Sequence, residues 1–162
     1  NNIKVSRTPA MTPSGNSDTV NSAVPAPHES KNETEANVHA KELPFIYSEI
    51  LRKGLSNYKN KKTVEAIEYF NEILDHFPKD INATFYKALC YFETENYFPA
   101  SELLRKAMLH SDKTFYEEAK FKLALCYAAL DQPAEAKKIL NEVIAEKGFY
   151  TDKAKEELRK LF

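Results

Sequence analysis

Apolar residues follow two different patterns along this chain, and the change falls near residue 44. Residues 1–43 contain no aromatic residue and four of the eight prolines, and polar residues fill most of the rest. Such a segment cannot bury enough apolar surface to offset the entropy lost on ordering, so we predict a disordered polar linker. From residue 44 to residue 162, apolar side chains recur at the three- and four-residue spacing of helices, which predicts one all-α domain.

Seven helices and no strand are predicted for this domain. Six of them form three pairs, over about residues 45–78, 80–111 and 114–148, and a last helix covers 151–161. Pro44 is expected in the first turn of the first helix, where a missing N–H costs little. The last helix is rich in Lys and Glu, as expected for the polar end of a helical stack.

Part of the sequence recurs in the second and third pairs. The residues Ala-Leu-Cys-Tyr at 88–91 return, 36 positions later, at 124–127. Ala100 and Ala136 repeat the same interval, whereas Ala66 and Ala100 are 34 residues apart. A period in the mid-thirties is typical of stacked helical repeats.

With these repeats aligned, residues 46–162 resemble the tetratricopeptide repeat (TPR) family. Gly54, Ala66, Phe70 and Pro78 stand at the family's intervals, and two extra residues enter the next repeat around 111–113. The resemblance implies a right-handed superhelix of three helix–turn–helix repeats followed by a C-terminal capping helix. It also implies a scaffold that binds proteins.

The C-terminal part looks like the TPR proteins of bacterial envelopes, in segments 127–130, 136–140 and 153–158. In those proteins the repeats often follow a membrane anchor and a polar linker. Because the chain begins at Asn1 without a methionine, we expect a fragment or a processed product. The expected location is periplasmic or membrane-anchored and extracytoplasmic, with contact to a membrane only through an upstream anchor. A cytoplasmic scaffold or regulator is the alternative.

Composition argues against several other functions. A net charge of −1 provides no basic face for nucleic acid, and three glycines leave no phosphate-binding loop. No catalytic triad, paired Cys-x-x-Cys or His-Glu-x-x-His motif is present, so we expect neither an enzyme nor a small-molecule substrate or cofactor.

The histidines and cysteines also follow the repeat. His76 and His110 lie 34 residues apart, each near the end of a second helix, which indicates structural equivalence rather than a metal site. Cys90 and Cys126 occupy equivalent places in successive repeats. Helices of successive repeats are on the order of 10 Å apart, too far for a disulfide, so both are predicted to be small buried residues.

The best candidate for function is an apolar stripe along the first helices of the repeats. In TPR proteins these helices line a concave groove that takes a peptide or a segment of another protein. The resemblance places the partner-binding groove at Leu51, Leu55, Tyr58, Phe85, Leu89, Phe92, Phe121 and Leu125. Within each helix these positions are spaced to share one face.

Three interpretations of the stripe remain open. The superhelix closes on itself, or residues 45–47 cover the stripe; a protein or peptide binds it; or two copies pair through it. TPR co-chaperones hold acidic chaperone tails with Lys, Arg and Asn, and the equivalent positions here are mostly apolar. A ligand is therefore expected to be an apolar or amphipathic segment.

Overall fold

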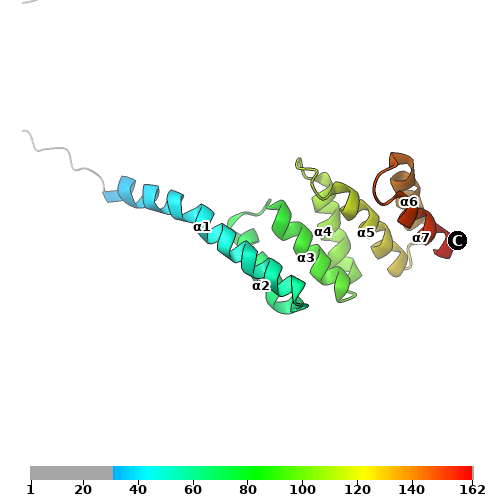
Figure 1. The fold of residues 1–162 in the computed structure, drawn as a ribbon, viewed down its shortest axis with the longest axis horizontal. Coiled ribbons are helices and arrows are strands. Elements are labelled where there is room, and N and C mark those ends of the chain that lie inside the picture. Colours follow the sequence, from blue (N-terminus) through cyan, green and yellow to red (C-terminus); the bar gives the residue numbers. More distant parts are fainter. Residues whose placement is uncertain (1–30, 162) are drawn as a thin grey trace, which may run out of the picture.

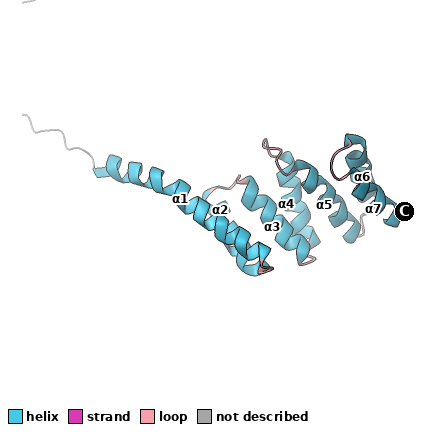
Figure 2. Ribbon diagram, viewed as in Figure 1, coloured by secondary structure: helices cyan, strands magenta, loops and turns pink. Residues whose placement is uncertain are grey.

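The computed structural model describes residues 31–161, with side chains from residue 43 onward (Figure 1). These residues form seven helices and no strand (Figure 2). The helices are α1 (Lys31–Lys59), α2 (Thr63–His76), α3 (Ile81–Glu93), α4 (Tyr97–Leu109), α5 (Tyr116–Ala129), α6 (Pro133–Glu146) and α7 (Thr151–Leu161). The all-α prediction is confirmed.

The helices form a one-dimensional stack in which each helix packs mainly on its neighbours in sequence. Figure 1 shows this array running from α1 at one end to α7 at the other, with the N-terminal half of α1 projecting beyond the rest. Pairs α1–α2, α3–α4 and α5–α6 are the three helix–turn–helix repeats, and α7 packs against α6. Stability in such an array depends on contacts between neighbouring repeats.

The first helix begins earlier than the sequence pattern indicated. Residues 1–30 of the predicted linker lie outside the described residues, whereas residues 31–43 form the first turns of α1. Glu, Ala and Lys are frequent in that stretch, and all three favour a helix. Pro44 therefore lies inside α1 rather than in its first turn, where it removes one helical hydrogen bond.

Small residues allow the helices to pack closely. The recurring alanines, including Ala66, Ala100 and Ala136, have no exposed surface. At Gly54 a Cβ atom would lie 2.7 Å from Cε1 of the buried Phe70 ring. The small residues that recur at the repeat interval therefore mark the places where helices come into close contact.

Equivalent turns join the two helices of each repeat. Lys61, Glu95 and Asp131 hold the left-handed conformation in these turns, with φ of 61°, 58° and 56°. At the end of α6 the left-handed residue is Lys147 (φ 56°), which directly precedes Gly148. Each of these four residues carries a side chain in a conformation that favours glycine.

Both cysteines are free and fully buried, as the sequence predicted. Burial raises the pKa of the Cys90 thiol to about 12, and that of the Cys126 thiol also to about 12. Neither thiol is ionised at neutral pH, so both act as packing residues.

Candidate functional site

Three of the eight predicted groove residues are buried in the core, which corrects that part of the prediction. Phe85, Leu89 and Phe121 are only 1%, 5% and 7% exposed. The Phe85 ring stacks on Phe115 at 4.2 Å between centroids, and the Phe121 ring stacks on Tyr150 at 4.9 Å. Phe115 and Tyr150 precede α5 and α7, so the segment that enters each following helix covers the stripe.

The other five predicted residues stay partly exposed: Leu51, Leu55, Tyr58, Phe92 and Leu125. The hydroxyl of Tyr58 donates to Oε1 of Glu93 at 2.7 Å, and Lys122 Nζ lies 4.6 Å from the centre of the Phe92 ring. The structure therefore leaves a narrower and more polar face than the sequence indicated. Binding of a partner to these five residues stays a prediction.

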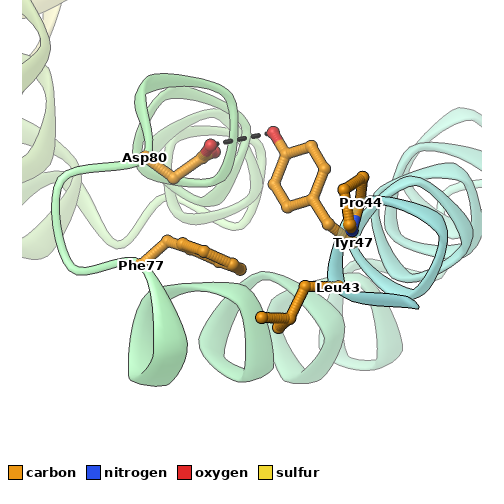
Figure 3. A pocket seen from close by; sticks show the side chains of 5 residues that line it. All are labelled: Leu43, Pro44, Tyr47, Phe77 and Asp80. Carbon is orange, nitrogen blue, oxygen red and sulfur yellow. Dashed lines mark hydrogen bonds between the residues drawn. The ribbon is translucent and has the colours of Figure 1, made fainter. Parts of the chain in front are cut away.

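An apolar cleft opens instead beside the projecting part of α1 (Figure 3). It has a volume of about 350 Å³, and its lining residues are Leu43, Pro44, Tyr47, Phe77 and Asp80. We call it the α1 cleft. A neighbouring hollow of about 140 Å³ shares three of these residues and extends between α1 and α2, adding Ile46, Ile50, Glu72, Ile73 and His76.

Tyr47 fixes the shape of the α1 cleft. Its hydroxyl donates to Oδ2 of Asp80 at 2.8 Å and accepts a hydrogen bond from Asn82 Nδ2 at 3.2 Å. Its ring meets Phe77 edge to face at 5.6 Å. Asp80 also accepts a bond from the backbone N–H of Ala83 at 2.7 Å, which caps α3. Burial and the bond to Asp80 raise the pKa of Tyr47, so this rim stays protonated and connected at neutral pH.

The helical segment that borders the cleft is apolar on every side. Residues 43–47 are Leu-Pro-Phe-Ile-Tyr, and five successive helical positions point all round the axis. Leu43, Phe45 and Ile46 are 43%, 74% and 47% exposed. A helix segment that is apolar on all sides is normally buried. Here a large part of its apolar surface is exposed to solvent, which makes it a candidate binding surface on α1.

The hollow between α1 and α2 has an equivalent one repeat later. A cleft of about 170 Å³ is lined by Pro78, Lys79, Ile81, Thr84, Lys106 and His110. We call it the second-repeat cleft. Thr84, Lys106 and His110 lie 34 residues after Ile50, Glu72 and His76, which line the first hollow. The two histidines therefore occupy equivalent positions, as their spacing predicted.

In the third repeat the same place is filled by an ion pair. Lys120, only 4% exposed, lies 3.0 Å from Oε2 of Glu142 and 2.6 Å from Oε1 of Glu146. Burial alone would lower the pKa of Lys120, but its bonds to both carboxylates and to Tyr116 raise the pKa above the ordinary lysine value. This site was not predicted from the sequence, although Lys120, Glu142 and Glu146 follow Thr84, Lys106 and His110 by the 36-residue interval.

The described residues contain neither a metal-site cluster nor a membrane-spanning helix. No cluster of three or more His, Cys, Asp or Glu side chains that could hold a metal ion occurs there. Within the same residues, no helix is both long and apolar enough to span a bilayer.

Comparison with known proteins agrees with the repeat architecture. The family described as anaphase-promoting complex, cyclosome, subunit 3 matches residues 59–143. The chain belongs to this family. It is a TPR-type repeat protein, as the sequence pattern indicated. A comparison with curated proteins finds no match.

Solved TPR structures resemble this TPR-type chain over most of its length. One is the first TPR of Spaghetti (RPAP3) bound to the HSP90 peptide SRMEEVD, with 25% identity and a TM-score of 0.61, covering 71% of this chain and 89% of that one. Another is the N-terminal domain of stress-induced protein-1 (STI-1) from C. elegans, with 16% identity and a TM-score of 0.60, covering 72% of this chain and 94% of that one. The second likeness is one of fold alone.

Proposed function

We propose that this domain is a non-enzymatic protein-interaction module that binds an apolar or amphipathic segment of a partner protein at the α1 cleft. The observation that carries the proposal is the helical segment 43–47, which is apolar on all sides and borders the cleft. The RPAP3 neighbour holds a peptide, which supports the same general activity for this chain.

The free energy gained by filling the α1 cleft alone is too small for stable binding, so the partner segment should cover a larger surface. Burying a large apolar side chain contributes about 1.5–3 kcal/mol, whereas association costs about 4–15 kcal/mol. Leu43, Phe45 and Ile46 together offset only part of that cost. The partner segment is therefore expected to extend along the neighbouring helices, where the five partly exposed first-helix residues, including Leu51 and Leu55, offer further apolar surface.

Selection from a random 12-residue peptide library displayed on phage tests the proposal with the whole chain. The wild-type protein should enrich peptides with large apolar residues, and Phe45→Glu combined with Ile46→Glu should abolish that enrichment. Val64→Glu is the matched control, because Val64 is 68% exposed on α2 and lies outside the residues lining the clefts described above. All variants should keep the helical circular dichroism, since the mutated side chains are largely exposed. Equal enrichment by wild type and the double variant would refute the site.

Self-association is the second candidate function. Segment 43–47 offers both a protruding side chain, Phe45, and a cleft on the same short stretch of helix, and a two-fold dimer needs such self-complementary surfaces. Light scattering over a range of concentrations distinguishes the two functions. A dimer that Phe45→Glu converts to a monomer would favour self-association over binding to another protein.

The proposal also includes a setting in a larger bacterial envelope protein, with the cytoplasm as the alternative. It rests on the resemblance of the C-terminal segments to envelope TPR proteins. The sequence that precedes Asn1 in the gene tests it directly. A gene that encodes neither an export signal nor a membrane helix upstream would exclude the envelope setting.

A further inference from the structure

The three repeats place three different sets of charges at one equivalent position. This position lies between the first helix of a repeat and the end of its second helix. In the first repeat it holds Ile50, Glu72 and His76; in the second, Thr84, Lys106 and His110; in the third, Lys120, Glu142 and Glu146.

The third repeat shows what this position can hold. A cation from α5, Lys120, is seated between two carboxylates of α6 and is almost completely removed from solvent. The two carboxylates are one helical turn apart on the same face, so both reach one charge. The buried cation therefore has its opposite charges within the chain.

The second repeat has the opposite charges and lacks the central group. Lys106 and His110 stand where Glu142 and Glu146 stand, and Thr84 replaces Lys120. The Thr84 hydroxyl donates to the backbone carbonyl of Asp80 at 2.7 Å, so it stays on its own helix. A cleft of about 170 Å³ remains, and none of the described residues that line it carries a carboxylate.

Two lysines beside this cleft have no ionic partner among the side chains that the structure describes. Neither Lys79 nor Lys106 makes a salt bridge or a side-chain hydrogen bond within residues 43–161. His110 Nδ1 accepts the backbone N–H of Asp112 at 3.0 Å, which leaves the Nε2 proton free to donate. Burial and repulsion by Lys106 lower the pKa of nearby Lys87, as expected where positive charges crowd.

The acidic residues near the cleft are already engaged. The carboxylate of Asp112 accepts bonds from the backbone N–H and the hydroxyl of Thr114, at 2.8 and 2.6 Å. That of Asp80 is held by Tyr47 and by the N-terminus of α3. Asp75 is the carboxylate that attracts Lys87. The cleft is therefore complementary to an anion supplied from outside.

We propose that the second-repeat cleft binds the carboxylate of an acidic residue in the same partner segment whose apolar side chains occupy the α1 cleft. The inference rests on the proposed function and specifies the chemistry of its ligand. The hollow that adjoins the α1 cleft is the equivalent of the second-repeat cleft. Equivalent points of neighbouring repeats are on the order of 10–20 Å apart, because packed helix axes are about 8–10 Å apart. An extended segment covers that distance in about 3–6 residues.

The same phage library provides the test. Peptides selected by the wild-type chain should be enriched in Asp or Glu about 3–6 residues from a large apolar residue. The variant Thr84→Lys with Lys106→Glu and His110→Glu reproduces the ion pair of the third repeat and should close the cleft without loss of fold. It should still select apolar peptides but no longer enrich acidic residues.

Lys138→Glu is the matched control, because it changes the formal charge by the same amount as the triple variant on an exposed part of α6. It should leave the acidic enrichment unchanged. Equal acidic enrichment by wild type and the triple variant, or none by wild type, would overturn the inference while apolar enrichment still supports the proposed function. Absence of any enrichment would overturn both.

A pair of synthetic peptides then measures the contribution of the carboxylate. One is a selected sequence, and the other carries Gln in place of each Glu and Asn in place of each Asp. The acidic peptide can form a charge-assisted hydrogen bond in the partly desolvated cleft, and the amide peptide cannot. Wild type should therefore bind the acidic peptide about tenfold more tightly than the amide peptide. For Lys106→Ala, which leaves the helix intact, this ratio should fall toward one; an unchanged ratio contradicts the assignment.

Discussion

Replacing Phe85 by alanine tests whether the apolar stripe is a core or a groove. The Phe85 ring is 1% exposed, stacks on Phe115 at 4.2 Å and meets Tyr86 edge to face at 5.6 Å. Removing such a ring loses its transfer free energy and leaves a cavity, which together cost about 3–5 kcal/mol. That is a large share of the roughly 5–15 kcal/mol by which a domain is stable.

Urea unfolding followed by circular dichroism at 222 nm measures the loss. With a slope of about 1–3 kcal/mol per molar urea, the midpoint for Phe85→Ala should fall by about 1–5 M. Phe92→Ala is the first control, since that ring is only half-buried and should cost about 1 kcal/mol. Phe98→Ala is the second, because its ring is 68% exposed and the change should lie within about 0.5 kcal/mol.

The opposite ranking would refute the reasoning. If Phe85→Ala changed the free energy of unfolding by less than about 1 kcal/mol, the ring could not be a core residue. If the variant stayed folded but lost peptide binding, the sequence-based groove would be right and the α1 cleft would lose its support. A fully unfolded Phe85→Ala agrees with a core position, and Phe85→Leu, which keeps most of the volume, should then restore the fold.

Three further predictions follow from buried groups. Lys120→Met should lower the free energy of unfolding by about 1–2 kcal/mol at pH 7. The loss is smaller than for a fully buried ion pair, because both partner carboxylates are half-exposed and solvent screens them. Because folding raises the pKa of Lys120, its contribution is complete below the ordinary lysine pKa of about 10.5 and is lost as the pH rises further. The difference in the free energy of unfolding between wild type and variant, measured by urea unfolding, should therefore be smaller at pH 11 than at pH 7, and a constant difference would contradict this. Cys90 and Cys126 should resist a thiol reagent in the native state and react in 6 M guanidinium chloride. Their raised pKa values also predict that stability falls between pH 9 and about 12, and rapid native labelling would refute the burial. Gly54→Ala should destabilise the domain by up to about 2 kcal/mol, because overpacking against Phe70 exceeds the helix propensity that alanine adds, and a raised thermal midpoint would contradict the close contact.

The repeat architecture was predictable because its signal is local and recurrent. Alanines such as Ala66 and Ala100 recur at intervals set by helix crossings, and close packing tolerates only small residues there. The interval alone therefore indicated the fold. The same interval also indicated that His76 and His110 would occupy equivalent places.

The exposure of the stripe was not predictable from helical spacing. Position along a helix shows which side chains share a face, but not what another segment places over that face. Phe115 and Tyr150 cover Phe85 and Phe121 from segments that precede α5 and α7, outside the periodic pattern. The early start of α1 was missed for a related reason, since residues 31–43 show no apolar face by which a helix is recognised.

The left-handed residues in the turns mark positions at which glycine would stabilise the domain. Lys61, Glu95 and Asp131 each hold a conformation that costs a residue with a side chain about 1 kcal/mol relative to glycine. None of the three lines the α1 cleft or the second-repeat cleft. Glycine at Glu95 and Asp131 would raise the free energy of unfolding while leaving both clefts intact. The domain could then serve as a stabilised scaffold on which new binding specificities are selected.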